Sequence, residues 1–215
     1  MKKVLSLVMV FMVAFMWATP GFSGNAYMSG NLGLTWMDDV EFTSNWTDDT
    51  EGFDLGTDSG VALSGAVGYD FGDYRAELEL GYQSNDVDSW ADSDDGYVSD
   101  AEEASGEVSV ISVMANGAYD IDLGGVELSP FVGAGFAFIS FDDAPVCFSG
   151  SEYRSKSATT FAYQIGASLA LPVADTIMLE GRYRYLGTAD FNFDRPEAEA
   201  DFASHSALVG LRFSL

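Results

Sequence analysis

Two segments of this chain alternate strictly between apolar and charged residues, and this pattern constrains the fold more than any other feature. Over residues 177–185 every odd-numbered position is apolar or aromatic, whereas Glu180, Arg182 and Arg184 lie between them. Residues 74–83 follow the same rule, with the charges at odd-numbered positions. A β-strand directs successive side chains to opposite faces. Each segment therefore predicts a strand with one apolar face and one charged face.

Similar alternation recurs along the rest of the chain after residue 24. The predicted strands cover residues 26–36, 60–69, 74–83, 107–119, 126–141, 158–171, 177–186 and 206–215. Their connections alternate between long and short, which is typical of a barrel with long extracellular loops, short periplasmic turns and both termini in the periplasm. Because lipid offers no hydrogen bonds to the backbone, strands cross a membrane only as a closed barrel. The predicted fold class is all-β, a transmembrane antiparallel up-and-down β-barrel of eight strands.

The start of the chain predicts a cleavable signal peptide. Its n-region is basic, residues 4–17 are apolar, and small residues precede Gly24. An apolar stretch of this length is too short to span a bilayer, which takes about 20 residues. An uncleaved anchor is the alternative. We expect a signal peptide at residues 1–23 and an outer-membrane β-barrel domain at residues 24–215.

The polar faces of the strands predict a charged lumen. An eight-stranded barrel encloses an interior only wide enough for side chains. The residues expected there are Arg75, Glu77, Glu79, Gln164, Glu180, Arg182, Arg184 and Arg212. The third and seventh strands face each other across the ring, and an unpaired buried charge is strongly destabilising. We therefore expect their carboxylates to pair with Arg182 or Arg184 in a salt-bridged plug, with a narrow selective pore as the alternative.

The apolar faces are expected to form a wall that contacts lipid. The fourth segment is apolar on both faces: Ile111 and Val113 are assigned outward, whereas Val108, Val110 and Met114 lie on the other face. Aromatic residues near strand ends are typical of girdles at the two membrane interfaces. These are Tyr69, Tyr74, Tyr82, Tyr119, Tyr183 and Tyr185.

The chain is strongly acidic, with a formal net charge of −25. Loss of residues 1–23 removes two lysines and no acid, which takes the net charge to −27. This charge excludes a nucleic-acid partner, whose phosphates would be repelled. Of the 34 Asp and Glu residues, 25 fall in four windows, residues 38–58, 84–107, 142–156 and 187–204. The windows are predicted to be long acidic loops outside the membrane, since a charge at the bilayer midplane costs about 2–4 kcal/mol.

Three polar features have both a structural and a functional interpretation. Residues 92–103 place acids at positions 1, 3, 9 and 12, as in a calcium-binding EF-hand, but Gly falls at position 5 and flanking helices are not expected. A solvated acidic loop that binds divalent cations weakly is the preferred interpretation. His205 is flanked by Ser204 and Ser206, as a hydrolase site at a barrel rim would need, but neighbours on a strand point to opposite faces. Cys147, the single cysteine, is expected to be a free thiol in a loop.

Five short motifs lie mainly in the second half of the chain. They read MANGAYD at residues 114–120, PFVGAG at 130–135, QIGA at 164–167, GRYRYLG at 181–187 and GLRF at 210–213. These motifs resemble the outer-membrane β-barrel surface-antigen family, which includes opacity-type proteins and the major surface antigens of rickettsia-like bacteria. The last motif, with Leu215 as the terminal apolar residue, resembles the assembly signal of such barrels. The resemblance implies a small eight-stranded barrel with variable loops, used for adhesion, surface display or weak porin activity, and it implies no catalytic residue.

Together these features predict an outer-membrane barrel of a Gram-negative bacterium that acts in envelope structure and surface interaction. A narrow porin is the alternative function, and a soluble barrel of the lipocalin type is the alternative fold. We expect no enzymatic activity, and the sequence assigns no catalytic, cofactor-binding or metal-binding residue. The expected partners are outer-membrane lipid, divalent cations held loosely at the acidic loops and a surface partner that the sequence does not identify. The chain is expected to be a monomer.

Overall fold

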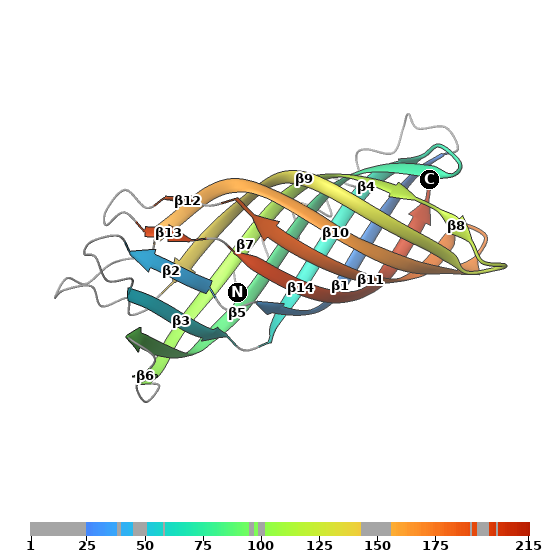
Figure 1. Ribbon diagram of the computed structural model, residues 1–215. Helices are drawn as coiled ribbons and strands as arrows, with labels where there is room; N and C mark the ends of the chain where they lie inside the picture. The colour runs from blue at the N-terminus through green and yellow to red at the C-terminus, as the bar shows by residue number, and fades with distance from the viewer. Residues whose placement is uncertain are drawn as a thin grey trace.

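The fold is built from β-strands throughout the part of the chain that the structure describes (Figure 1). The computed structural model describes residues 25–37, 40–44, 51–57, 59–94, 97–98, 102–142, 156–189, 191–192, 198–200 and 202–215. The strands are β1 (Ala26–Met37), β2 (Val40–Ser44), β3 (Glu51–Thr57), β4 (Gly60–Asp70), β5 (Tyr74–Asp94), β6 (Tyr97–Val98), β7 (Glu102–Tyr119), β8 (Ile121–Asp122), β9 (Glu127–Asp142), β10 (Lys156–Ala174), β11 (Ile177–Thr188), β12 (Phe191–Asn192), β13 (Ala198–Ala200) and β14 (Ala203–Ser214). Among these residues, no helix has the length and apolar character needed to cross a membrane.

Eight of the described strands close into one antiparallel ring. The pairs are β1–β4, β4–β5, β5–β7, β7–β9, β9–β10, β10–β11 and β11–β14. The ring closes between β14 and β1, where Gly30 lies opposite Leu211 and Thr35 lies opposite Ser206. Closure leaves the barrel without a free sheet edge. The prediction of an eight-stranded up-and-down β-barrel is confirmed.

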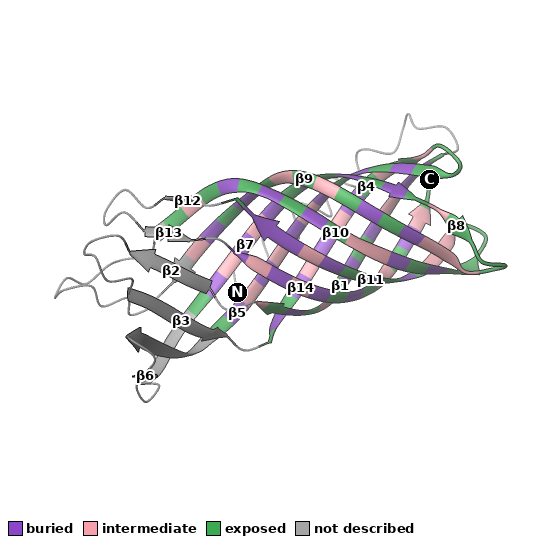
Figure 2. Cartoon of the chain, viewed as in Figure 1, coloured by how far each residue is buried: buried purple, intermediate pink, exposed green. Residues whose placement is uncertain are grey.

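Buried and more exposed residues alternate along the barrel strands wherever their burial is described (Figure 2). On β4, Val61 is 56% exposed whereas the neighbouring Ala62 is 1% exposed. On β7, Val113 is exposed and Met114 is buried, which confirms the outward phase assigned to this strand. The apolar face of the barrel therefore points outward and the charged face points inward. A soluble barrel of the lipocalin type is contradicted, because it would bury its apolar face.

The short connections gather at one end of the barrel, together with the start of β1 and the end of β14 (Figure 1). There the backbone N–H of Asp120 donates to the carbonyl of Asp73, and the N–H of Leu215 donates to the carbonyl of Ala26. Short turns lie on the periplasmic side in outer-membrane barrels. We therefore call this end the periplasmic end. The small strands β2, β3, β12 and β13 lie at the opposite end of the barrel.

The prediction of long loops is wrong for the described residues of the windows 38–58, 84–107 and 187–204, which include β-strands. Residues 143–155 lie outside the described residues, so the loop predicted at 142–156 remains a prediction. β5 continues to Asp94 and β7 begins at Glu102, and the two strands stay paired as far as Trp90 opposite Glu102. The strands β2 and β3 pair with each other, and β3 pairs with the far part of β5. Beyond a membrane no lipid requires an apolar face on a strand, so the sequence of a strand there need not alternate. Without alternation these strand extensions looked like loops.

Several predictions lie outside the described residues. They concern the signal peptide and its cleavage before Gly24, the thiol of Cys147, and the side chains of residues 92–103. These remain predictions.

Candidate functional site

Two facing strands, β5 and β11, carry the charged side chains at the centre of the lumen. β5 contributes Glu77 and Glu79, and β11 contributes Glu180, Arg182 and Arg184. Each of these five side chains is 2% exposed or less. Three barrel strands separate β5 from β11 on either side of the ring, so the two strands face each other across the lumen. We call these five residues the middle layer.

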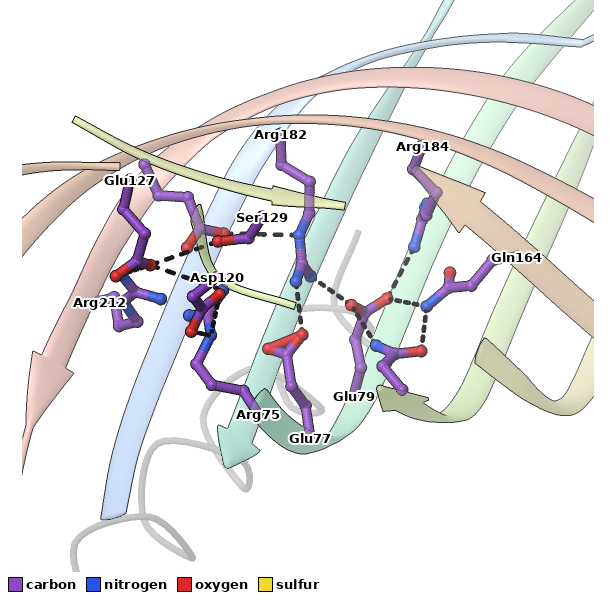
Figure 3. Close-up of polar contacts among 12 residues, drawn as sticks. Arg75, Glu77, Glu79, Asp120, Glu127, Ser129, Gln164, Arg182, Arg184 and Arg212 are labelled. Carbon is purple, nitrogen blue, oxygen red and sulfur yellow. Dashed lines mark hydrogen bonds and ion pairs between the residues drawn. The ribbon is translucent and has the colours of Figure 1, made fainter. Parts of the chain in front are cut away.

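Arg182 is the centre of the middle layer (Figure 3). Its Nη2 donates to Glu77 Oε1 at 2.6 Å, and its Nη1 donates to Glu79 Oε2 at 2.6 Å. Its Nε lies 3.5 Å from Glu180 Oε1. Arg184 Nη1 donates to the second oxygen of Glu79 at 3.0 Å. A guanidinium presents several donors in a fixed plane, so one arginine bridges two carboxylates. The predicted pairing of these carboxylates with Arg182 and Arg184 is confirmed.

Two amide side chains complete the bonding of Glu79. Gln164 Nε2 donates to Asn116 Oδ1 at 2.6 Å, and Asn116 Nδ2 donates to Glu79 Oε2 at 3.2 Å. Gln164 Nε2 also lies 3.4 Å from Glu79 Oε1. Glu79 therefore accepts hydrogen bonds from four side chains, which come from β7, β10 and β11. A buried carboxylate is tolerated when its lone pairs are satisfied in this way.

A second charged group lies toward the periplasmic end, and we call it the lower layer. Arg75 Nε lies 2.8 Å from Asp120 Oδ2, and Arg212 Nη2 lies 2.5 Å from Glu127 Oε1. Arg75 Nη2 lies 3.8 Å from the same Glu127 oxygen, which links the two pairs. The guanidinium carbons of Arg75 and Arg212 lie 5.4 and 5.7 Å from the centre of the Tyr27 ring. This layer shares its chemistry with the middle layer, but the side chain of Glu127 is 26% exposed.

A cluster of buried apolar side chains lies in the lumen beside and beyond the middle layer, toward the long connections. Its members are Val108, Val110, Met114, Ala137, Ile139, Ala162, Leu186 and Phe202. The inward apolar face of the fourth predicted strand thus belongs to an internal core, in which Met114 lies opposite Glu79 on β5. The lumen is therefore charged at the centre and near the periplasmic end. Beyond the middle layer it holds apolar side chains together with buried uncharged polar ones, such as Gln83, Asn85 and Thr35.

The arrangement suits a structural lock better than acid–base chemistry. The two layers together contain five carboxyl groups and four guanidinium groups. A guanidinium keeps its proton at any physiological pH, so the four arginines themselves cannot act as a general acid or base. Within the described part of the chain, no three His, Cys, Asp or Glu side chains gather in a way that could hold a metal ion.

His205 lies on the outer wall, away from the two serines that flank it. Ser204 and Ser206 are fully buried in the lumen. The Nδ1 of His205 lies 2.7 Å from the hydroxyl of Tyr183, and its ring also lies 5.0 Å from the ring of Tyr185. The geometry confirms that the histidine and its neighbouring serines point to opposite faces.

All eight lumen residues predicted from the alternation are buried, but three of their partners were not predicted. Asn116 and Glu127 occupy inward positions in the phase of β7 and β9, so the alternation contained a signal for both. Asp120 follows β7 in a turn, and its contact with Arg75 depends on how that turn folds over the lumen. Alternation along a strand carries no information about such a turn.

Known proteins share this architecture over nearly the whole chain. Residues 4–213 match the family described as Outer membrane protein beta-barrel domain. The outer membrane protein PagN of Salmonella typhimurium is 22% identical over 240 residues, with 100% of each chain covered. These matches cover both halves of the chain.

Two solved structures have a similar fold. Neisserial surface protein A aligns with a TM-score of 0.55 and 15% identity, over 89% of this chain and 98% of its own. The outer membrane protease OmpT of Escherichia coli aligns with a TM-score of 0.55 and 9% identity, over 92% of this chain and 99% of its own. At these identities the likeness shows the fold alone. With its closed barrel, outward apolar wall and family match, the chain belongs to the outer-membrane β-barrel family and is a protein of the bacterial outer membrane.

Proposed function

We propose that this protein is a closed outer-membrane barrel that acts in envelope structure and surface interaction. The observation that carries the proposal is the bridge from Arg182 on β11 to Glu77 and Glu79 on the facing strand β5. Because this bridge spans the lumen, it holds opposite walls of the barrel together. The barrel then serves as a rigid support for whatever its long connections contact, and binding residues commonly lie on loops supported by a rigid scaffold.

The burial of the lumen supports closure over permeation. A pore needs a continuous wet path, yet Arg184, Glu79 and Glu180 are each 1% exposed. Beyond them the lumen holds the apolar cluster together with the buried side chains of Gln83, Ser204 and Thr35, which bond to other groups of the protein. The narrow porin is therefore the weaker candidate, although the ion-pair network would serve as its selectivity filter if water entered.

Single-channel conductance separates the two functions. The chain from residue 24 to residue 215 is refolded, its folding is checked by heat-modifiable gel mobility, and it is inserted in a planar bilayer. A closed barrel leaves the bilayer silent, whereas long-lived conductance steps of the unchanged protein would make it a porin. Arg182→Ala removes the bridge and is expected to introduce brief conductance events. Arg212→Ala, which leaves the middle layer complete, is the matched control and is expected to stay silent.

Surface interaction is proposed from the concentration of acidic residues beyond the barrel. The windows 38–58 and 84–107 carry 8 and 9 acids, and β2 and β3 of the first window lie at the end opposite the short turns (Figure 1). Divalent cations are the expected counter-ions, and carboxylates without a preformed cage bind them weakly, with a Kd of about 10⁻⁴ to 10⁻³ M. Neisserial surface protein A is named as a surface protein, which agrees with this role. OmpT is a protease, but we propose no enzymatic activity for this chain.

Calcium titration tests this second part of the proposal. The refolded protein is compared with a variant in which Asp92, Asp94 and Asp95 are changed to Asn. Weak calcium binding that falls in the variant and in added salt is expected, because exposed charges are screened. Equal binding by the two proteins would remove the acidic window 84–107 from the proposal.

A further inference from the structure

Glu180 is the one carboxyl group of the two charged layers that lies away from an arginine. Each of the other four has an oxygen within 2.8 Å of an arginine nitrogen. Glu180 Oε1 lies 3.5 Å from Arg182 Nε, and within the described residues neither of these two atoms has a hydrogen-bond partner. The residue is nevertheless 1% exposed. Glu180 is therefore buried without the close ion pair that the other carboxyl groups have.

The two layers contain more carboxyl groups than arginines. They hold five carboxyl groups and four guanidinium groups. Arg182 is already shared by Glu77 and Glu79, and Arg184 bonds to Glu79. If all five carboxyl groups were ionised, one negative charge would therefore have no arginine of its own. A buried charge without a partner is strongly destabilising, and a buried carboxyl group commonly avoids this cost by keeping its proton.

The surroundings of Glu180 do not supply the missing positive charge. The charged groups that interact with Glu180 are Arg182 on the same strand and Arg75, Glu77 and Glu79 on β5. The two β5 carboxylates repel a negative charge at this position, because like charges disfavour ionisation. Arg75, and Arg212 on the neighbouring strand β14, are held by carboxylates of the lower layer. The residues directly opposite Glu180 on β14 and β10 are Gly210 and Ala170, which are uncharged.

We propose that the middle layer holds one proton, on the carboxyl group of Glu180, when the barrel is folded at neutral pH. The proton supplies the missing positive charge without the room that a bound ion needs. The two layers then contain four carboxylates and four guanidinium groups, and their charges balance. The bridge between the facing strands consequently depends on pH. Loss of the proton places an unpaired negative charge beside Glu77 and Glu79 and weakens the bridge.

The pH dependence of unfolding tests this proposal. The pKa of a glutamate in the unfolded chain is about 4.3, so its carboxyl group is ionised there above about pH 5. A folded barrel that keeps the proton binds one proton more than the unfolded chain, and its stability therefore falls as the pH rises. Glu180→Gln keeps the shape of the neutral acid but binds no proton, so it lacks this dependence. The unfolding equilibrium constant of the unchanged protein, divided by that of the variant, should rise about tenfold per pH unit between about pH 5 and pH 7.

Glu77→Gln is the matched control, because Glu77 is a buried carboxylate of the same layer with a close bond to Arg182. This variant should be less stable than the unchanged protein at pH 7, whereas Glu180→Gln should be more stable. Urea titrations in detergent, with gel mobility as the readout, measure both variants at each pH. A ratio for Glu180→Gln that does not change with pH would show that Glu180 is ionised in the folded barrel, and this would overturn the proposal.

Infrared spectroscopy detects the proton directly, because the C=O stretch of a neutral carboxyl group is separate from the bands of a carboxylate. In nanodiscs at pH 7, the unchanged protein should show this stretch, Glu77→Gln should retain it, and Glu180→Gln should lose it. If Glu180→Gln does not fold, the unchanged protein decides, and absence of the stretch overturns the proposal. A sodium ion in place of the proton would leave a carboxylate and give the same negative result. The conductance test of closure does not depend on either readout.

Discussion

The middle layer and the lower layer contain the same ion pairs at different depths. In the middle layer, Arg182 binds carboxylates of the facing strand in surroundings that water does not reach. In the lower layer, Arg212 binds Glu127, whose side chain is 26% exposed near the periplasmic end. A charge that water reaches can lose its partner and be solvated instead. A charge that water does not reach depends on its partner entirely.

The difference suggests different roles for similar chemistry. The middle layer joins opposite walls, and all three of its carboxylates contact Arg182, while Glu79 also contacts Arg184. The lower layer joins residues close to the turns, where it covers the entrance of the lumen. We therefore expect the middle layer to determine the stability of the barrel and the lower layer to make a modest, salt-sensitive contribution.

Replacing Arg182 by Ala should have the largest effect. The change leaves Glu77 and one oxygen of Glu79 buried without a cation, and breaking one partner of a buried pair costs about 3–5 kcal/mol. The free energy of unfolding is measured from urea titrations in detergent, with gel mobility as the readout. If the variant does not fold, Arg182→Lys, which keeps the charge but loses the planar fork, is used in its place.

A small loss in the free energy of unfolding for Arg182→Ala would contradict the expected difference between the middle and lower layers. Arg212→Ala, measured in the same way, is the matched control. Equal destabilisation by the two arginine variants would show that depth does not distinguish the layers.

Replacing Met114 by Ala tests whether the apolar cluster supports the middle layer. Met114 is fully buried beside Glu79, and removal of a buried methionine side chain costs about 2–5 kcal/mol through lost burial and the cavity left behind. The same urea titration measures this loss, and added salt should leave it unchanged because no charge is removed. A salt-dependent loss would mean that water enters the cavity and reaches the middle layer.

Replacing Arg212 by Ala should reduce the free energy of unfolding by about 1 kcal/mol, the upper range for pairs that water reaches. Salt should shrink the difference between variant and unchanged protein, because ions screen exposed charges. Urea titrations at low and high sodium chloride concentration provide the measurement. A difference that stays constant over this range would place Glu127 in the same dry surroundings as Glu79.

The alternation of residues was sufficient to predict the eight strands and the direction of their side chains. It worked because lipid requires apolar side chains at the outward positions, whereas the inward positions of the narrow lumen are mostly polar or small. It failed where this division between the two faces no longer holds. The inward apolar face of β7 contradicts a simple polar interior, and the extended ends of β5 and β7 lie beyond the wall that enforces alternation.

The individual partners in the charged layers were only partly predictable. Facing strands could be identified by counting around a ring of eight, which placed Arg182 opposite Glu77 and Glu79. The choice among neighbouring carboxylates depends on the stagger of the strands, which the sequence of a single strand does not contain. The longer distance from Glu180 to Arg182 was not predicted either, because an inward Glu on a charged face has the same pattern whether or not it is closely bonded.

The smallest predicted effect lies outside the charged layers, at the turn that follows β8. Asp122 Oδ1 accepts hydrogen bonds from the backbone N–H groups of Gly124 and Gly125, at 2.8 and 3.3 Å. These bonds lower the pKa of the Asp122 carboxyl, since they favour its charged form. A lowered pKa in the folded protein adds stability above the pKa of the unfolded chain, near about 4, and this contribution is lost as the pH falls through the folded pKa. At pH 7, the urea midpoint of unfolding of Asp122→Asn should be slightly lower than that of the unchanged protein. In strong acid, the two proteins should have the same urea midpoint. A difference that persists in acid would assign the effect to the shape of the turn, which the positive φ angles of both glycines already constrain.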